Sequence, residues 1–352
     1  IANKMKTAVI CCGLSCLDLQ LLGCTKSGTE EAIEHYEEAV YCAGGSASMT
    51  AATLSLLTKS SSDVDIHVLT KLGRDFNGDK MQEFYKEAGA ITDMVLIDPS
   101  SRTSMAVLPV FASGGRGCFV NLACNEGFTT TEVLTQLDSA PDNVRAFLFG
   151  YPHLLPLMQG ENLHSMLCSV KAKLGESCLV GVDLNGVSAD NHNDSLLSPA
   201  LGDIDILHLN EEEASILCGG EDSSTLHSHG CAVILLSLGS RGVKISTTED
   251  DCRLRRCPGQ IKHWAAGSKI HVPAFQINGD INANGAGDAL FSGFCLASSW
   301  SDETTISLKQ AGEFASLVAR QRCDTITRDS APESADFLMN KVQNGNLPEI
   351  IA

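Results

Sequence analysis

Short apolar runs rich in β-branched residues recur along this chain, and an amphipathic stretch separates each run from the next. The runs are AVICCGL, DIHVLTKLG, RAFLFG, CLVGVDLN, DILHLN and AVILLSL. Because their apolar residues do not alternate with polar ones, they are typical of strands buried on both faces. Intervening stretches such as DKMQEFYKEAGA and QGENLHSMLCSVKAKLG have helical spacing, and the second closes on Gly175, a helix terminator. The alternation predicts an α/β fold, a doubly wound and mostly parallel sheet with helices on both faces.

Two segments break this alternation and predict a small β lid. SRTSMAVLPVFASGGRGCFVNLAC fits two strands around a glycine-rich turn without a helix between them, hence a hairpin outside the main sheet. TKSGTEEAIEHYEEAVYCAGG is a polar connection from the first strand to the first glycine pair. Since no repeat, low-complexity tract or linker is visible, we expect residues 1–352 to form one domain, with lid segments at about 19–43 and 101–125.

The overall charge argues against a polyanionic partner. The formal net charge is -18 and the pI is about 4.9, whereas nucleic-acid-binding proteins carry a basic surface. An acidic chain instead suits Mg²⁺, which prefers oxygen ligands. No apolar run approaches the roughly 18 residues of a membrane span, and IANKMKTAVICC lacks the pattern of a signal peptide. We therefore expect a cytoplasmic protein that does not bind membranes.

The fifteen cysteines are scattered through apolar runs, which predicts reduced and mostly buried thiols. Two groups offer zinc ligands, namely His227 with His229 and Cys231, and the pair Cys252 and Cys257. Neither group has a second ligand pair at zinc-finger spacing, so the pattern favours the absence of a structural zinc ion.

The stretch NGDINANGAGDALFSGF carries the most informative motif. Gly285, Ala286 and Gly287 leave backbone amides uncovered by side chains, and the following run is patterned like a buried helix. A helix that begins there directs its amides and the positive end of its dipole at an anion. Asp288 would repel that anion as a ligand, so a role in proton transfer fits it better. Together these residues indicate phosphoryl transfer to a hydroxyl group.

Two features near the first strand are candidates for the acceptor site. Asp18 follows that strand, and open α/β sheets bind ligands at the carboxyl ends of their strands. Its carboxylate either holds two sugar hydroxyls or caps a turn. Gly44 and Gly45 precede the helical run SASMTAATLSLL. They allow a close approach of backbone to ligand, although glycine pairs before helices are common in structural turns.

Three further strand ends are candidates for the nucleotide and the metal. Asn210 begins NEEEASIL, which places Glu213 in the first helical turn, either as a metal ligand or as an acid favoured by the helix dipole. GVDLNG places Asp183 and Asn185 at a strand end, as caps or as ligands of phosphate and Mg²⁺. SLGSRG makes a glycine turn after a strand, as a loop at the edge of a nucleotide would.

Several common catalytic motifs are absent from the sequence. It contains no Gly-x-x-x-x-Gly-Lys-Ser/Thr loop, no Gly-x-Gly-x-x-Gly after a strand and no His-Glu-x-x-His helix. The Gly-x-Ser-x-Gly nucleophile elbow is missing too. P-loop kinases, Rossmann dehydrogenases, zincin proteases and α/β-hydrolases therefore lose support.

The motifs occur in a diagnostic order along the chain. Asp18 comes first, then Gly44-Gly45, the hairpin, Asp183/Asn185, Asn210-x-x-Glu213, Gly239-x-x-Gly242 and Gly285-Ala286-Gly287-Asp288. This order resembles that of the ribokinase family of sugar and nucleoside kinases, the phosphofructokinase B group, from about residue 8 to about residue 325. The resemblance implies a doubly wound sheet with a β lid, and ATP-dependent phosphorylation of a hydroxymethyl group.

The resemblance also implies a role for each motif. Asp288 would be the catalytic base, and Gly285, Ala286 and Gly287 would stabilise charge on the transferring phosphoryl group. The acceptor would be bound by Asp18, Gly44, Gly45, Met49 and Asn125. The nucleotide would be bound by Asn185, Asn210, Ser237, Gly239 and Gly242. Glu213 and Asp183 would serve the hydrated Mg²⁺.

Two departures from the family pattern concern the cation and the acceptor. The usual Asp-Thr before the Gly-Ala-Gly-Asp motif is replaced by Asn282 and Ala283, which makes dependence on a monovalent cation such as K⁺ doubtful. The asparagine usual after the glycine pair is Met49, and a thioether cannot donate a hydrogen bond. The acceptor therefore differs from ribose or is held by less polar contacts.

Three functions remain open at this level. The leading hypothesis is a Mg-ATP-dependent kinase of a sugar or sugar-like metabolite. A nucleoside kinase is the second, but the hairpin offers only Phe111 and Phe119 for stacking on a base. The third is a sugar- or nucleotide-binding protein with weakened catalysis, which intact Asp288 argues against. The exposed edges of the lid would permit a homodimer, and a monomer is equally compatible.

Overall fold

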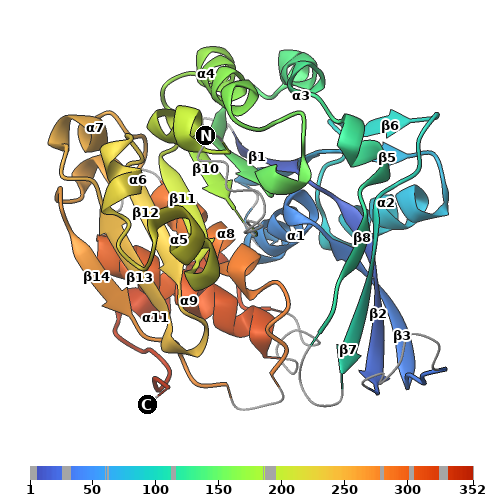
Figure 1. The fold of residues 1–352 in the computed structure, drawn as a ribbon. Coiled ribbons are helices and arrows are strands. Elements are labelled where there is room, and N and C mark those ends of the chain that lie inside the picture. The colour runs from blue at the N-terminus through green and yellow to red at the C-terminus, as the bar shows by residue number, and fades with distance from the viewer. Residues whose placement is uncertain are drawn as a thin grey trace.

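The structure is a computed structural model that describes residues 6–25, 33–59, 61, 63–111, 116–184, 186, 196–277, 281–300, 305–324 and 332–351. Its centre is an eight-stranded sheet with helices on both faces (Figure 1). In spatial order the strands are β14 (Lys269–Val272), β13 (Val243–Thr247), β12 (Val233–Ser237), β11 (Ile206–Asn210), β10 (Leu179–Asp183), β9 (Val144–Gly150), β1 (Thr7–Gly13) and β4 (Val64–Leu69). Pairing is parallel from β4 to β12 and antiparallel at β13 and β14. The predicted fold class is confirmed.

The sheet separates two hydrophobic cores, and this explains the unbroken apolar runs. In β1, Val9 and Cys11 belong to one core, while Ala8, Ile10 and Cys12 belong to the other. Successive side chains of a strand point to opposite faces, so a strand covered on both sides needs apolar residues at every position.

Each core is closed by its own set of helices. One face is covered by α1 (Ser46–Thr58), α2 (Phe76–Ala88), α7 (Asp251–Arg255), α8 (Ala286–Ser298), α9 (Leu308–Cys323) and α11 (Ala335–Gln343). The other is covered by α3 (Thr130–Gln136), α4 (Glu161–Leu174), α5 (Glu211–Cys218) and α6 (Ser224–Ser228). As predicted, α4 ends at Gly175, which has a φ of 89°.

The lid is a second, four-stranded sheet in the order β3 (Glu38–Gly44), β2 (Cys16–Cys24), β7 (Met105–Phe111) and β8 (Phe119–Asn121). It projects from one side of the main sheet (Figure 1). The predicted hairpin is β7 with β8, which pair antiparallel. The segment interpreted as a polar connection ends in strand β3, which pairs antiparallel with β2. A separate two-stranded sheet joins β5 (Lys71–Gly73) to β6 (Leu96–Asp98).

Close contact between α1 and the ends of two main-sheet strands positions the loops that follow them. Gly45 precedes α1 with a φ of 82°, and a Cβ there would lie 2.5 Å from the carbonyl oxygen of Leu14. A Cβ on Gly150, the last residue of β9, would lie 2.2 Å from Cβ of Ser46. Only glycine fits these two positions, which bring the start of α1 against the ends of β1 and β9.

All fifteen cysteines lie in the described residues and are free thiols. Neither predicted zinc group forms a metal-ligand cluster among the described residues. The ring of His227 instead bonds the carbonyl oxygen of Cys231 at 2.9 Å and Oγ of Ser246 at 2.8 Å. Within the described part of the chain, no helix has the length and apolar character that crossing a membrane requires.

Candidate active site

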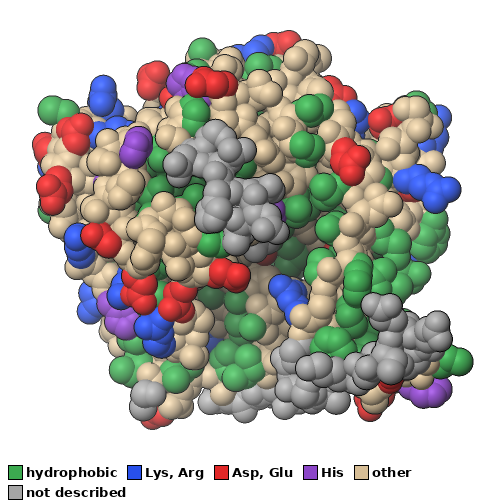
Figure 2. Space-filling model, viewed as in Figure 1, with side chains coloured by type: hydrophobic (Ala, Val, Ile, Leu, Met, Phe, Trp, Pro, Cys, Tyr) green, Lys and Arg blue, Asp and Glu red, His purple; other side chains and the backbone are tan. Residues whose placement is uncertain are grey.

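A cavity of about 640 Å³ lies at the carboxyl ends of the central strands. Figure 2 shows a hollow between the larger part of the molecule and the lid, with acidic and basic side chains at its margin. Its lining includes the predicted residues Asp183, Asn210, Glu213, Ser237, Gly239, Gly242, Gly285, Ala286, Gly287 and Asp288. Residues from four distant parts of the sequence thus meet in one site. Open α/β sheets bind ligands at this position, outside the carboxyl ends of their strands.

The anion loop has the geometry that its glycines predict. Gly285 immediately precedes α8 and has a φ of 79°, in the left-handed region. A Cβ at Gly285 would lie 2.5 Å from Cε of Met49, so the loop packs tightly against α1. The first-turn amides of a helix have no acceptor within the helix. The amide of Ala286 donates to the carbonyl oxygen of Ala283 at 3.1 Å, whereas Gly287 and Asp288 line the cavity, where their amides suit a phosphate group.

Asp288 is a buried carboxyl group in the first turn of α8, with 6% of its surface exposed. The hydroxyl of Tyr151 donates to both of its oxygens, at 2.8 and 3.0 Å. Burial and the charge of Asp183 raise the pKa of Asp288 to about 7, against the lowering effects of Tyr151, His208 and Arg322. A carboxylate with a pKa near neutrality is well suited to accept a proton from a hydroxyl group.

Tyr151 is held in an unusual backbone conformation. It follows β9 with φ 62° and ψ 50°, and its amide donates to the carbonyl oxygen of Asp183 at 2.9 Å. Positive φ is costly for a residue with a side chain and is concentrated at functional sites. Burial and the charge of Asp288 raise the pKa of the Tyr151 hydroxyl well above its ordinary value, so it remains a hydrogen-bond donor.

A second buried group of side chains lies beside Asp288. Asp183, 1% exposed, contacts Nδ1 of His208 through Oδ1 at 2.8 Å, and Nε2 of His208 contacts Oγ of Ser237 at 3.2 Å. Burial would lower the pKa of His208, but the charge and hydrogen bond of Asp183, with the charges of Glu213 and Asp288, raise it. His208 thus lies among three carboxyl groups that favour its protonated form.

Asn210 and Glu213 form a capping box at the start of α5 while they line the cavity. Oδ1 of Asn210 accepts from the Glu213 amide at 3.0 Å, and Oε2 of Glu213 accepts from the Asn210 amide at 2.8 Å. The amide of Gly186 also donates to Oε1 of Glu213. Burial raises the pKa of Glu213, and the Asn210 amide and His208 oppose that effect. Glu213 therefore caps the helix, and the same carboxylate lies at the cavity, where its role as a metal ligand stays a prediction.

Among the predicted acceptor residues, Met49 lies against Gly285 of the anion loop, and Asp18 lies against Gly44. Three carboxylate atoms of Asp18 lie 2.1 to 2.4 Å from where a Cβ on Gly44 would be, so Asp18 fits against this glycine. Burial raises the pKa of Asp18, and a hydrogen bond from Cys16 and the charge of Arg116 oppose that effect. The described lining of the cavity does not include Asp18, Gly44, Gly45 or Met49, although Met49 contacts Gly285 as noted above.

The two remaining predicted site residues are Asn125 and Asn185. Asn125 is fully buried, and its amide group donates to the carbonyl oxygen of Ser15 at 3.1 Å and to Oγ of Ser104 at 2.6 Å. Through these bonds Asn125 joins the residues that immediately precede lid strands β2 and β7, and it is not among the described residues that line the cavity. Asn185 lies outside the described residues.

Sequence analysis did not select Tyr151, His208 or Arg116, which also line the cavity. Arg116 extends from the lid and donates to Oδ1 of Asn284 in the anion loop. The sequence position of each of these three residues could have indicated a place in the site. Tyr151 follows a buried strand, His208 is a polar residue inside one, and Arg116 is a cation in the glycine-rich turn of a predicted lid.

Comparison with known proteins agrees with this geometry. Residues 6–330 match the profile of the pfkB family of carbohydrate kinases. The chain belongs to the pfkB family. Comparison with curated proteins found no match.

Solved structures of similar fold include ribokinases and a nucleoside kinase. The chain is similar to ribokinase from Giardia lamblia, with 17% identity, a TM-score of 0.75, and coverage of 97% of this chain and 100% of the other. It is also similar to Arabidopsis thaliana ribokinase complexed with ribose and ATP, with 18% identity, a TM-score of 0.72, and coverage of 96% of this chain and 99% of the other. A nucleoside kinase from Methanocaldococcus jannaschii has 17% identity and a TM-score of 0.67, with coverage of 97% of this chain and 100% of the other. At these identities the likeness establishes the fold, and the acceptor must be inferred from the site itself.

Proposed function

We propose that this pfkB-family protein transfers a phosphoryl group from Mg-ATP to a hydroxymethyl group of a sugar or sugar-like metabolite. The observation that carries the proposal is the position of Asp288, a buried carboxyl group with a pKa of about 7 at the start of a helix behind a glycine turn. That pKa also favours an active enzyme over a binding protein with weakened catalysis, since the base is poised to act near neutral pH.

In the proposed reaction Asp288 accepts the proton of the acceptor hydroxyl as its oxygen attacks the terminal phosphorus of ATP. The amides that follow Gly285 stabilise the charge on the transferring group, because they are fixed before the reaction begins. Tyr151 keeps the Asp288 carboxyl oriented through its hydrogen bonds. The bond from phosphorus to the leaving oxygen breaks, and ADP is released.

Nucleotide and metal would lie on the side of β11 and β12. Asn210, Ser237, Gly239 and Gly242 line that part of the cavity and would contact ATP. Asp183 and Glu213 supply buried carboxylate oxygens, the ligand type that a partly hydrated Mg²⁺ requires. When bound, the ion would neutralise phosphate charge.

The acceptor would lie between the lid and the anion loop. Asp18 would accept hydrogen bonds from two of its hydroxyls, while Arg116 spans from the lid to Asn284 and would help exclude water. A nucleoside remains the second candidate acceptor, because a nucleoside kinase is among the proteins of similar fold.

The experiment that tests this function is ADP release from Mg-ATP with a panel of pentoses, hexoses, ketohexoses and nucleosides, with and without K⁺. We expect acceptor-dependent ADP with a sugar. Activity without K⁺ would agree with the replacements Asn282 and Ala283. ADP release with nucleosides alone would replace the sugar by the second candidate. Ligand binding without ADP from any acceptor would overturn the proposed catalysis.

Replacing Tyr151 with phenylalanine is expected to move the acid limb of the kcat/KM profile to higher pH by about one to two units. The hydrogen bond from Tyr151 stabilises the ionised form of Asp288 and lowers its pKa, so its loss raises that pKa. Bonds to charged groups contribute about 1.5–3 kcal/mol, and one pKa unit corresponds to about 1.4 kcal/mol. The profile is measured between about pH 5 and 9.

Tyr36→Phe serves as the matched control, because Tyr36 is exposed and should leave the profile unchanged. A Tyr151→Phe profile that coincides with the wild-type profile would show that Tyr151 does not tune the base.

A further inference from the structure

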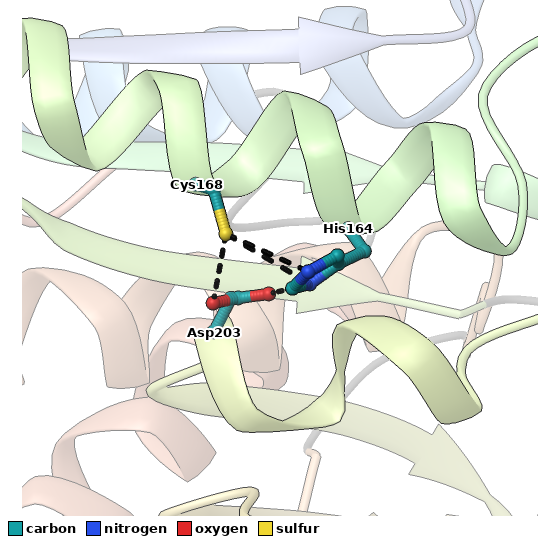
Figure 3. A group of neighbouring side chains, drawn as sticks. All are labelled: His164, Cys168 and Asp203. Carbon is teal, nitrogen blue, oxygen red and sulfur yellow. Dashed lines mark hydrogen bonds and ion pairs between the residues drawn. The ribbon is translucent and has the colours of Figure 1, made fainter.

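Three side chains with different metal-binding groups converge outside the kinase cavity (Figure 3). His164 and Cys168 lie one turn apart on α4, so both project from the same face of the helix. Asp203 faces them from the end of the 3₁₀ helix Ser198–Asp203, η4. Their ligand atoms all lie within 4.8 Å of one another.

The distances within this cluster are close to those of a metal site. Nδ1 of His164 lies 2.6 Å from Oδ2 of Asp203, and Sγ of Cys168 lies 3.4 Å from Oδ1 of Asp203. The sulfur lies 3.8 and 3.9 Å from the two ring nitrogens of His164. A tetrahedral zinc ion with ligands at about 2.0–2.3 Å holds its donor atoms roughly 3.3–3.7 Å apart. Small side-chain rotations would therefore bring all three donors onto one ion.

Solvent can reach the cluster, and the nearby cation Lys171 is held by another carboxylate. The side chain of His164 is 41% exposed and that of Asp203 19%, and Cys168 is exposed. Lys171, the next turn along α4, is directed to Asp205 at 3.1 Å. An ion could enter without disturbing either hydrophobic core.

The same three residue types occur in cysteine nucleophile triads, but the surroundings of the Cys168 thiol are unfavourable for that function. Burial and the nearby carboxylate of Asp203 raise the pKa of the Cys168 thiol, so the nucleophilic thiolate is disfavoured. None of the three residues lines the kinase cavity, so no substrate bound there would reach the Cys168 thiol. A bound metal ion would reverse the effect of Asp203 on the Cys168 thiol, because the Asp203 carboxylate would then be a ligand of the ion.

We propose that His164, Cys168 and Asp203 form a zinc site with a water molecule in the fourth position. Nitrogen and sulfur donors select zinc over Mg²⁺ and Ca²⁺, which prefer oxygen. On binding, a bond forms between zinc and sulfur, and the thiol proton passes to the solvent. Two donors spaced i, i+4 on one helix face are a known zinc-binding arrangement, and Asp203 adds a third from another segment.

Zinc at this position would connect two segments that lead into the kinase site. Helix α4 precedes β10, which ends at Asp183, and η4 precedes β11, which ends at Asn210. An ion that binds only the folded chain stabilises it by mass action. The site would therefore act on stability, and the kinase chemistry would not pass through it.

The test is titration of the metal-free full-length protein with Co²⁺, followed by displacement with Zn²⁺. Cobalt reports a thiolate ligand through its charge-transfer absorption. We expect one Co²⁺ per chain with this absorption, displacement by Zn²⁺, and a rise in melting temperature with added Zn²⁺. Cys168→Ser should abolish the absorption, and His164→Gln should weaken binding by more than about tenfold, as removing even an indirect partner of a metal ligand does.

Cys252→Ser is the matched control, since Cys252 is an exposed cysteine outside the cluster. It should bind Co²⁺ as the wild type does, and Cys168→Ser should keep wild-type ADP release. Cys323, which lines the kinase cavity, is an alternative thiolate ligand that this comparison excludes. Equal cobalt absorption in the wild type and Cys168→Ser, or none in the wild type, would overturn the proposal.

Discussion

Replacing Asp288 with asparagine is expected to lower turnover by about a hundredfold or more, the usual cost of removing a general base. Asparagine has nearly the same shape and can still accept a hydrogen bond from Tyr151, which now donates to the carboxylate at 2.8 Å. The capacity to take up a proton is lost, together with the negative charge of the carboxylate. The measurement is kcat for the best acceptor of the panel at saturating Mg-ATP.

The same substitution is expected to stabilise the folded chain above neutral pH. The pKa of Asp288 is about 7 in the fold, against an ordinary value of 3.8. Below pH 3.8 the carboxyl is protonated in both states, so its ionisation does not affect stability. Between the two values only the unfolded chain releases the proton, and the free energy of unfolding falls as pH rises. Above about pH 7 the full cost of burying the charge applies, about 1.4 kcal/mol per pKa unit.

Chemical denaturation at about pH 8 should therefore show Asp288→Asn to be more stable than the wild type by a few kcal/mol. Asp205→Asn is a matched control. Asp205 is fully buried outside the cavity and bonds Nη2 of Arg253 at 3.0 Å, so neutralising it should destabilise the fold. Full turnover in Asp288→Asn would refute the catalytic role, and lower stability at pH 8 would refute the raised pKa.

The main sheet was predictable because its signal is local. Strand β1 lies between two cores, so its residues from Ala8 to Cys12 are all apolar and the run is visible in the sequence. The lid was harder to predict. β2 is buried only over its first residues, and β3 is mostly exposed or half-buried, so neither has a continuous apolar run. The parallel pairing of β2 with β7 joins segments far apart in the chain, which no local pattern encodes.

The candidate site likewise has a part that was predictable from the local sequence and a part that was not. The anion loop was predictable because Gly285 and Asp288 act within a few residues of one another, and φ 79° at Gly285 requires a residue like glycine. The partners of Asp288 come from other strands. Tyr151 follows β9 and His208 lies in β11, and only the strand order brings them together. Glu213 was ambiguous because its capping bonds and its place in the cavity use the same carboxylate.

Replacing Gly44 with alanine is expected to lower kcat/KM for the acceptor by about a hundredfold and leave the KM for ATP unchanged. The new Cβ would lie 2.1 Å from Oδ1, 2.3 Å from Cγ and 2.4 Å from Oδ2 of Asp18, so the carboxylate must turn away. Gly44 has no positive φ, so the backbone itself accepts alanine. Losing two hydrogen bonds to a charged group, each at the lower end of about 1.5–3 kcal/mol, accounts for an effect of this size.

A double-mutant cycle with Asp18→Ala separates this mechanism from general damage near the lid. If Gly44→Ala acts by displacing Asp18, each single variant should lose a similar amount and the double variant should lose no more than either, because both remove one interaction. Gly127→Ala is the control, since its added Cβ would meet no atom within 4 Å. Losses that add in the double variant, or a raised KM for ATP, would mean that Asp18 does not bind the acceptor. Loss confined to the acceptor would instead identify Asp18 as the group that recognises it, and the pattern of sugars still tolerated by Gly44→Ala would show which hydroxyls it holds.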